Sequence, residues 1–218
     1  MLTMGIPGFR LEKNVVEAEI EVLRQLGVHF RTGVEVGKDV TIQQLRQQGF
    51  QAFYLAIGAQ GGRKLNIPGE DAEGVVAGVD FLRSINLGSI PAMTGKTVVI
   101  GGGNVAIDVA RAAARTDAVS VDMYCLESRS EMPALPEEIQ EAEEEHIAIH
   151  NGYGPREILV KDGRAVGVVF KKCLRVFDEN HRFAPQYDEN DTITVETDHV
   201  LLSIGQSIQW GNLLAGTA

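Results

Sequence analysis

The residues most suited to chemistry form a glycine-rich turn at positions 101–106, with the sequence GGGNVA. The pattern is G-x-G-x-x-A: Gly101 allows a tight turn, Gly103 allows a diphosphate to approach the backbone, and Ala106 allows a helix to pack closely. Apolar and β-branched residues precede the turn, and an amphipathic helical pattern follows it. Because the first amides of a helix and the positive end of its dipole favour phosphate, the segment predicts a dinucleotide site. A glycine turn with only a structural role is the alternative.

An acidic residue at the end of the next predicted strand supports this interpretation. Residues 119–126 precede Glu127, which follows the turn at close to the ~20-residue spacing expected of a ribose-binding carboxylate. A carboxylate there accepts hydrogen bonds from the ribose hydroxyls and repels a 2′-phosphate, which favours NAD over NADP. Arg129 could instead pair with a 2′-phosphate, so NADP stays possible. Solvated loop charges are the structural alternative for both residues.

Composition and charge narrow the class of protein. The chain has 218 residues, 44% of them hydrophobic and 23% charged, which suits one large globular domain or two small ones. Its net charge of −10 argues against a nucleic-acid-binding surface. No stretch reaches the ~18 apolar residues of a membrane span, and no signal-peptide pattern is present. We therefore expect a cytoplasmic protein that binds neither nucleic acid nor membrane.

The cysteines and histidines lack the patterns of redox and metal sites. Cys125 and Cys173 are far apart, which excludes a C-x-x-C redox pair and a cysteine-ligated iron–sulfur cluster within this chain. His146 and His150 are separated by a β-like stretch, which argues against a shared metal ion. No metal site is predicted.

The remaining pattern supplies the elements that must position the turn. Helical spacing and apolar runs predict helices at 11–26, 41–45, 79–85, 104–115 and 136–146, and strands at 28–31, 50–59, 96–100, 119–126 and 199–204. Alternating patterns predict antiparallel strands at 156–160, 165–176 and 192–196, with Asp162-Gly163 as a hairpin turn. The glutamate-rich helix at 136–146 indicates a solvated face or, alternatively, a docking surface. The order predicts an α/β fold: a Rossmann-like nucleotide-binding domain with an inserted antiparallel β-meander.

Several motifs resemble the glutamate synthase small-subunit (beta chain) family of flavoproteins. The similar segments are Met4-Gly5-Ile6-Pro7 with Phe9-Arg10-Leu11, Ala56-Ile57-Gly58-Ala59, Ile67-Pro68-Gly69-Glu70, residues 101–111, Glu131-Met132-Pro133-Ala134, and Ser203-Ile204-Gly205-Gln206. The segment 101–111 is longer and more specific than a generic glycine motif. The resemblance implies an oxidoreductase that passes hydride from NAD(P)H to FAD. Electrons would then pass through iron–sulfur clusters to a partner such as a large subunit. Hydride transfer needs no protein acid or base, so no catalytic residue is assigned.

The resemblance also implies that the chain is a fragment of a longer protein. We expect residues 1–92 to be the C-terminal portion of an incomplete FAD-type domain, 93–206 an NAD(P)-binding domain, and 207–218 the start of the return into the FAD-type domain. The family's opening FAD-binding glycine unit has no counterpart here, so we expect FAD in the full-length protein and weak retention by this chain, which alone is expected to be inactive. Where many members carry arginines suited to NADP, this chain has Leu126 and Glu127, which again favours NAD.

Two other functions stay open at this stage. They are an electron-input subunit of a different reductase, such as one serving ferredoxin, and an NAD-binding module without catalysis. The absent cysteine pair argues against a disulfide reductase of the same fold. The predicted cofactor-binding residues are Gly101, Gly102, Gly103, Asn104, Val105, Ala106, Glu127, Ser128, Arg129, Gly58, Gly205 and Gln206.

Overall fold

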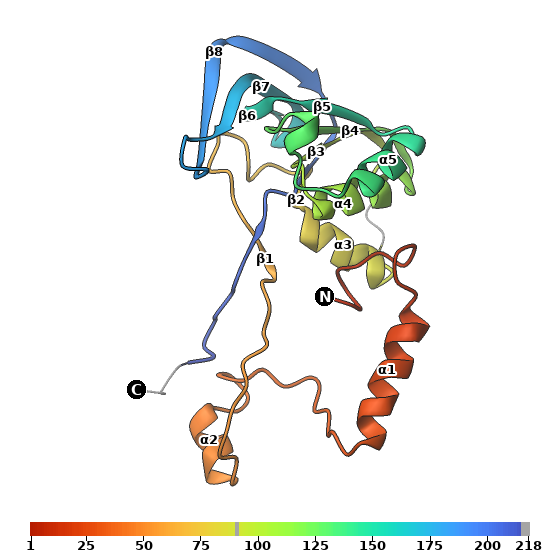
Figure 1. Ribbon diagram of the computed structural model, residues 1–218, viewed down its shortest axis with the longest axis vertical. Helices are drawn as coiled ribbons and strands as arrows, with labels where there is room; N and C mark the ends of the chain where they lie inside the picture. The colour runs from red at the N-terminus through yellow and green to blue at the C-terminus, as the bar shows by residue number, and fades with distance from the viewer. Residues whose placement is uncertain (90–91, 215–218) are drawn as a thin grey trace.

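A computed structural model describes residues 1–89 and 92–214. Its elements are α1 (Lys13–Gln25), α2 (Ile42–Gln47), β1 (Gly61–Gly62), β2 (Val75–Ala77), α3 (Gly78–Asn86), β3 (Gly95–Ile100), α4 (Asn104–Ala114), β4 (Ala118–Cys125), the 3₁₀ turn η1 (Arg129–Glu131), α5 (Pro136–Glu144), β5 (Ala148–Asn151), β6 (Tyr153–Lys161), β7 (Arg164–Phe177), β8 (Phe183–Glu196), β9 (His199–Leu202) and β10 (Gln206–Ser207). Figure 1 shows an upper body built on sheets, with two segments below it: an orange one that leads to α2 and a blue one that leads toward the carboxyl-terminal end, while α1 follows the amino-terminal loop. None of the helices in the described ranges is long and apolar enough to cross a bilayer.

The upper body is centred on a five-stranded parallel sheet with the order β2-β9-β3-β4-β5. The chain passes from β3 through α4, β4 and α5 to the edge strand β5, and later returns as β9 on the opposite side of β3. The direction of strand addition therefore reverses between β3 and β9. Open α/β sheets bind ligands beyond the carboxyl ends of their strands at such a reversal. Gly101, which follows β3 directly, lies at this position.

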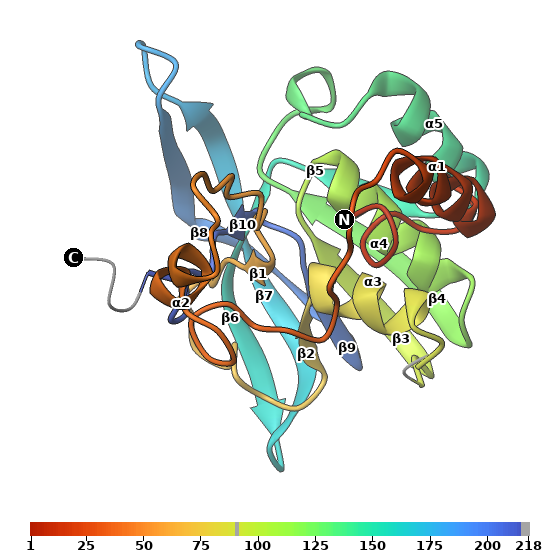
Figure 2. The same cartoon turned by 90° about the horizontal axis from the view of Figure 1, so that it is seen from below.

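Helices α3, α4 and α5 cover one face of the parallel sheet (Figure 2). Val99 of β3 and Met123 of β4 are fully buried in the core that this layer shares with the sheet. The buried side of α4 carries small residues, including Ala106 and Ala110, which are both fully buried. Small side chains let the helix axis approach the sheet closely, and this sets the position of the amino-terminal end of α4.

The antiparallel sheet β6-β7-β8 packs on the opposite face of the parallel sheet (Figure 2). Tyr124 of β4 stacks against Phe170 of β7 with ring centroids 4.2 Å apart. The β6–β7 hairpin turns at Asp162 and Gly163, whose φ values of 53° and 82° are both in the left-handed region. Two such residues are the signature of a type I′ hairpin. The predicted meander and its hairpin turn are confirmed.

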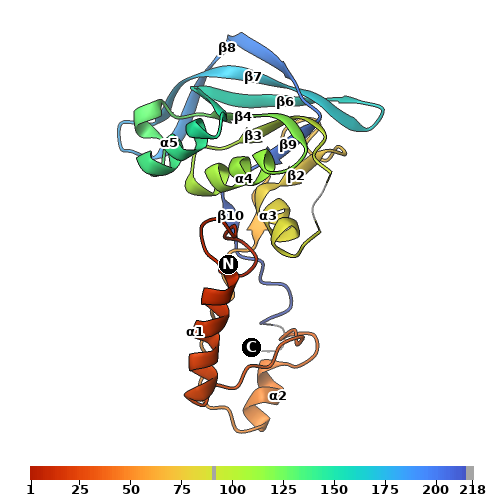
Figure 3. The same cartoon turned by 90° about the vertical axis from the view of Figure 1, so that its right-hand side faces the viewer.

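A short antiparallel ribbon of β1 and β10 joins the upper body to the segments below it (Figure 3). The Arg63 amide donates to the Gly205 carbonyl at 3.0 Å, and Arg63 Nε donates to the Gln206 carbonyl at 3.2 Å. Below the ribbon, α2 begins at a capping box in which Thr41 and Gln44 bond each other's backbone amides.

Two predicted strands do not form in the described residues. Segments 28–31 and 50–59 belong to no helix or sheet, and Tyr54 is 93% exposed. A strand needs a partner for its amides and carbonyls, and neither segment meets one within the described ranges. The prediction of a buried strand at 50–59 is therefore wrong for this structure.

The parallel sheet begins earlier in the chain than residue 93, where the sequence predicted its domain to start. β2 pairs in parallel with β9, and α3 packs beside α4 with Phe81 only 1% exposed. A domain starting at 93 would leave out one strand and one helix of its own layers. Residues 90, 91 and 215–218 lie outside the described residues, so the predicted return segment 207–218 is described only as far as 214.

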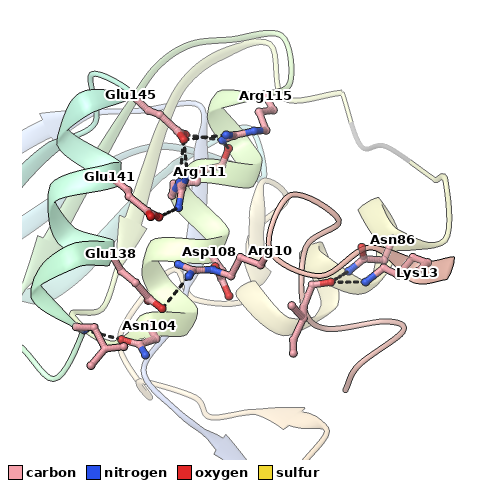
Figure 4. A network of polar contacts seen from close by, with 12 residues as sticks. Arg10, Lys13, Asn86, Asn104, Asp108, Arg111, Arg115, Glu138, Glu141 and Glu145 are labelled. Carbon is pink, nitrogen blue, oxygen red and sulfur yellow. Dashed lines mark hydrogen bonds and ion pairs between the residues drawn. The ribbon is translucent and has the colours of Figure 1, made fainter. Parts of the chain in front are cut away.

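The amino-terminal arm, residues 1–12, lies against the helical layer (Figure 4). The Asn86 side-chain amide donates to the Met4 carbonyl at 3.0 Å. The Arg10 guanidinium forms ion pairs with Asp108 of α4 and, at 2.8 Å, with Glu138 of α5. One residue of the arm thus joins two helices of the layer that covers the parallel sheet.

The glutamates of α5 also have cationic partners within the chain (Figure 4). Arg111 of α4 forms ion pairs with Glu141 and, at 2.6 Å, with Glu145, which also pairs with Arg115. The two interpretations of this helix, a solvated face or a docking surface, are therefore both incomplete. Glu141 and the C-cap residue Glu145 join this helix to α4, whereas Glu138 pairs with Arg10 of the arm.

Candidate functional site

The glycine turn is built by close contacts that only glycine permits. Gly101 has a φ of 143°, and a Cβ at this position would lie 2.3 Å from the Ser203 carbonyl oxygen and 3.3 Å from the Ala106 Cβ. Gly101 is therefore where β3, β9 and α4 approach one another most closely. By contrast, a Cβ on Gly103 would meet no atom within 4 Å, so the space in front of Gly103 is open.

The open space faces a row of unused amides. The backbone N–H groups of Gly102, Gly103, Asn104 and Val105 donate to no other group within the described residues. Gly103 is the N-cap residue of α4, and no side chain caps the helix. The first turn contains no acidic residue. Unused amides together with the positive end of a helix dipole form an anion-binding site.

Glu127 stands beside this turn, as the sequence predicted. A Cβ on Gly102 would lie 2.8 Å from Glu127 Oε2, so the carboxylate lies directly over the turn. Burial raises the pKa of Glu127, and its own backbone amide opposes that shift. The Glu127 carbonyl accepts hydrogen bonds from the Asn151 side chain at 3.1 Å and the Gly152 amide at 3.2 Å. The end of β4 is thus fixed, and the carboxylate pairs with no cation in the described chain.

Ser128 and Arg129 are both engaged in local contacts. The Ser128 hydroxyl donates to Glu131 at 2.5 Å, and the two residues form a capping box around η1. The Arg129 guanidinium binds the Glu143 carboxylate through both terminal nitrogens, one of them at 2.8 Å. The cation that sequence reasoning proposed for a 2′-phosphate is therefore already paired with α5.

The loop before α5 closes onto the turn through Asn104, a connection that sequence reasoning missed. The Leu135 amide donates to Asn104 Oδ1 at 2.9 Å, and the Ala134 amide donates to the Gly102 carbonyl at 3.2 Å. The E-M-P-A motif thus lies against the glycine turn. The glycine-rich motif and the E-M-P-A motif thus form one local structure. Their presence in the same sequence was the one signal that could have predicted this contact.

The remaining predicted site residues lie on the connecting ribbon. Gly205 and Gln206 bind Arg63 through their carbonyl groups. Gly205 has a φ of 107°, and Gly58 has a φ of 66°. Both glycines therefore serve left-handed turns of the connection, and a Cβ on Gly58 would meet no atom within 4 Å.

The two thiols are not arranged for redox chemistry. Cys125 and Cys173 are both buried and free. Burial raises the pKa of Cys125 to about 12, with Glu127 adding to the effect, and burial also raises the pKa of Cys173. A thiol that stays protonated is a poor nucleophile. In the described ranges no three His, Cys, Asp or Glu side chains gather as metal ligands.

The parallel sheet has unused amides where its strand order reverses, and a carboxylate follows the neighbouring strand. Together these features define the class of dinucleotide-binding domains. The model of the pyridine nucleotide-disulphide oxidoreductase family matches residues 13–210. The chain belongs to this family.

Curated relatives refine the resemblance. The chain is 36% identical over 214 residues to the NADP(+)-dependent formate dehydrogenase subunit beta of Moorella thermoacetica. This alignment covers 95% of this chain and 30% of the relative. It is 33% identical to the NADPH-Fe(3+) oxidoreductase subunit beta of Geobacter sulfurreducens strain PCA, over 94% of this chain and 31% of that relative. It is also 33% identical to the glutamate synthase [NADPH] small chain of Azospirillum brasilense, over 94% of this chain and 45% of the relative. The resemblance is confirmed, and the chain spans less than half the length of each.

Solved structures support the fold alone. FprA of Mycobacterium tuberculosis in complex with NADPH is similar with a TM-score of 0.77 at 20% identity, covering 94% of this chain and 61% of that one. Thioredoxin reductase of Lactococcus lactis is similar with a TM-score of 0.53 at 22% identity, covering 72% of this chain and 45% of that one. The predicted α/β fold with its inserted antiparallel sheet is confirmed.

Proposed function

We propose that the chain binds the diphosphate of a reduced nicotinamide dinucleotide on the unused amides at the start of α4. The observation that carries the proposal is the open space at Gly103, faced by four amides without a partner. Ala106 and Val105 support it by placing the helix end beside the sheet. Glu127 would accept hydrogen bonds from the adenosine ribose.

We further propose that the chain is the nicotinamide-binding part of a flavoprotein that resembles the glutamate synthase small subunit. When bound in the full-length protein, FAD would supply the chemistry of accepting a hydride and giving up single electrons. The residues of this chain contribute binding and orientation, and none is proposed to transfer a proton. Weak retention of FAD by this chain stays a prediction, which the visible absorption of purified protein tests.

The electron acceptor is proposed from the relatives. Two are beta subunits and one is a small chain, and this favours a partner subunit that receives the electrons, with iron–sulfur clusters as the proposed carriers. A glutamate synthase large subunit is the first candidate. A formate dehydrogenase or an Fe(3+) reductase is the second, because these names belong to similar chains. Free cysteines support a cytoplasmic location.

The domain boundary and the choice of coenzyme are the remaining parts of the proposal. We propose that the nucleotide-binding domain extends from about residue 75, where β2 begins, to 206, because β2 and α3 share its sheet and helical layer. Glu127 favours NADH, whereas the names of the three relatives favour NADPH.

Calorimetric titration of the purified chain with NADH and with NADPH tests the proposal directly. We expect saturable binding of at least one coenzyme and competition by 5′-AMP. No heat with either coenzyme would refute the proposed site. Assaying glutamate formation by the full-length protein with a large subunit then separates glutamate synthase from the other acceptors.

A further inference from the structure

A second concave feature lies beside the proposed site, between the end of β4 and strand β7 of the meander. The pocket has a volume of about 250 Å³. Its polar lining consists of Ser128, Arg129, Glu131, Asn151, Lys172 and Arg175, and Glu131, the one carboxylate among them, accepts a hydrogen bond from the Ser128 hydroxyl. Small-molecule sites typically begin near ~300 Å³, so the pocket suits one end of a ligand better than a whole ligand.

The pocket adjoins the predicted ribose-binding carboxylate through the chain itself. Leu126 and Ser128, which flank Glu127, both line the pocket, while the Glu127 carboxylate lies over Gly102. Asn151, also in the lining, bonds the Glu127 carbonyl at 3.1 Å. A ligand whose ribose reaches Glu127 would therefore extend its next groups toward the pocket.

Two cations of β7 at this pocket are free of carboxylates. Lys172 and Arg175 form no ion pair within the described residues, unlike Arg129, which Glu143 holds. The Lys172 ammonium lies 4.6 Å from the ring centroid of Tyr153. A Cβ on Gly152 would lie 3.1 Å from Lys172 Nζ. The ammonium is thus held at the edge of the pocket above Gly152.

The strand that carries these cations is irregular where it borders the pocket. The pairing of β7 with β8 shifts register between Lys171 and Lys172, and again between Cys173 and Arg175. Consecutive residues from Lys172 to Val176 all line the pocket, which a regular strand with alternating side chains would not allow. Bulges commonly redirect side chains beside ligand sites.

We propose that this pocket receives the adenosine end of the dinucleotide, and that Lys172 and Arg175 bind a phosphate at the ribose 2′ position. The inference rests on the proposed function. The meander would supply the positive charge that offsets the repulsion of a 2′-phosphate by Glu127, and NADPH is then accepted although the acid of an NAD-type site is present. Charge-assisted contacts to phosphate are the strong class of hydrogen bond.

Competition between two adenosine nucleotides isolates this contact, because they differ only in the 2′-phosphate. We expect adenosine 2′,5′-bisphosphate to bind the purified chain more tightly than 5′-AMP. In the double variant Lys172→Ala/Arg175→Ala, the bisphosphate and NADPH should bind at least about tenfold more weakly. Binding of 5′-AMP and NADH should change less than about twofold.

The matched control is Lys161→Ala/Arg182→Ala, which removes the same charge from exposed positions of the meander region. It should leave both affinities unchanged. Equal loss of NADH and NADPH binding in the pocket variant, or no loss of either, would overturn the assignment. Tighter binding of 5′-AMP than of the bisphosphate by the parent chain would do so as well.

The single variants Lys172→Gln and Arg175→Gln provide an independent measurement should the double variant fold poorly. Each removes one positive charge and keeps a polar side chain, so each should weaken binding of the bisphosphate while leaving binding of 5′-AMP nearly unchanged. Single variants that fold and bind the bisphosphate as tightly as the parent contradict the inference alone. Absence of binding by every nucleotide would instead reject the proposed function.

Discussion

Arg10 and Asp108 lie 98 positions apart in the sequence, yet their side chains form an ion pair that ties the amino-terminal arm to α4. The helix so engaged begins at the glycine turn. Asp108 is one turn from Asn104, whose side chain binds the loop before α5. The arm, α4 and α5 are thereby joined as one unit.

Replacing Arg10 by methionine should destabilise this unit. Asp108 and Glu138 have side chains only 13% and 14% exposed, and burial already raises the pKa of both carboxyls. Without the Arg10 guanidinium, both carboxylates lose their ion-pair partner at positions that water reaches poorly. We expect a loss of about 1–3 kcal/mol in the free energy of unfolding, measured in urea, below the range for fully buried pairs because water reaches these groups.

Arg24→Met serves as the control, because Arg24 pairs with Glu17 and Glu21 on an exposed face of α1. Such pairs contribute little to stability. The double variant Arg10→Met/Asp108→Asn should recover part of the loss, since one stranded charge is gone. Equal effects of the Arg10 and Arg24 substitutions would show that the arm does not stabilise the layer formed by α4 and α5.

The pairing of Glu145 makes stability depend on acid pH. Hydrogen bonds from Arg115 and then Arg111 lower the pKa of Glu145 to about 2 from an ordinary value of 4.5. A carboxyl with a lowered folded-state pKa stabilises the fold above its unfolded-state pKa, and this contribution disappears as the pH falls from about 4.5 to about 2. Glu145→Gln should therefore be less stable than the parent at pH 6, with the difference shrinking to zero near pH 2.

Glu137→Gln is the matched control, because Glu137 is exposed in the same helix and forms no ion pair within the described chain. Denaturant titrations at several pH values provide the measurement. A difference between parent and Glu145→Gln that stays constant across the acid range would contradict the assigned pairing.

The turn and the sheet could be predicted from sequence because their signals are local. Gly101, Gly103 and Ala106 lie within six positions, and each has a single steric reason to be small. Strand β3 is apolar on both faces because helices cover one side and the meander the other. A continuous run of apolar residues of this kind is typical of a buried strand in a parallel sheet.

The partners of charged side chains could not be predicted, because they depend on tertiary distances. Arg129 follows Glu127 in the sequence, but only the fold shows that Glu143 occupies it. The glutamates of α5 likewise appeared solvated until α4 and the arm were placed beside them. The prediction of a strand at 50–59 was wrong for the same reason. The composition of this segment suits a strand, but a strand also needs a neighbouring strand to pair with, and composition does not show whether one is present.

Asn104→Asp should separate the structural and ligand-binding roles of the amino-terminal end of α4. Aspartate keeps the acceptor for the Leu135 amide and adds a negative charge at a helix amino terminus, which is worth about +0.3–1 kcal/mol to stability. The same charge repels a diphosphate. We expect unchanged or slightly higher stability and clearly weaker coenzyme binding. Asn104→Ala should instead lose about 1 kcal/mol of stability, because the Leu135 amide loses its partner. Thermal unfolding and calorimetric titration of both variants provide the comparison.

Two alanine substitutions in the same turn should have opposite consequences. A Cβ on Gly101 would lie 2.3 Å from the Ser203 carbonyl oxygen at a φ of 143°, so Gly101→Ala should unfold or severely destabilise the chain. A Cβ on Gly103 meets nothing within 4 Å, and its backbone has a φ of −94° that alanine accepts. Gly103→Ala should therefore remain folded with a loss of no more than about 1 kcal/mol.

Coenzyme binding should also be affected by the substitution at Gly103. The space in front of Gly103 is where the proposed diphosphate meets the amides, so the added methyl group should weaken NADH and NADPH binding at least about tenfold. Gly8→Ala, at another position without neighbours within 4 Å, should change neither stability nor binding. A folded Gly103→Ala protein with undiminished affinity for both coenzymes would mean that the diphosphate lies elsewhere and that the turn has only a structural role.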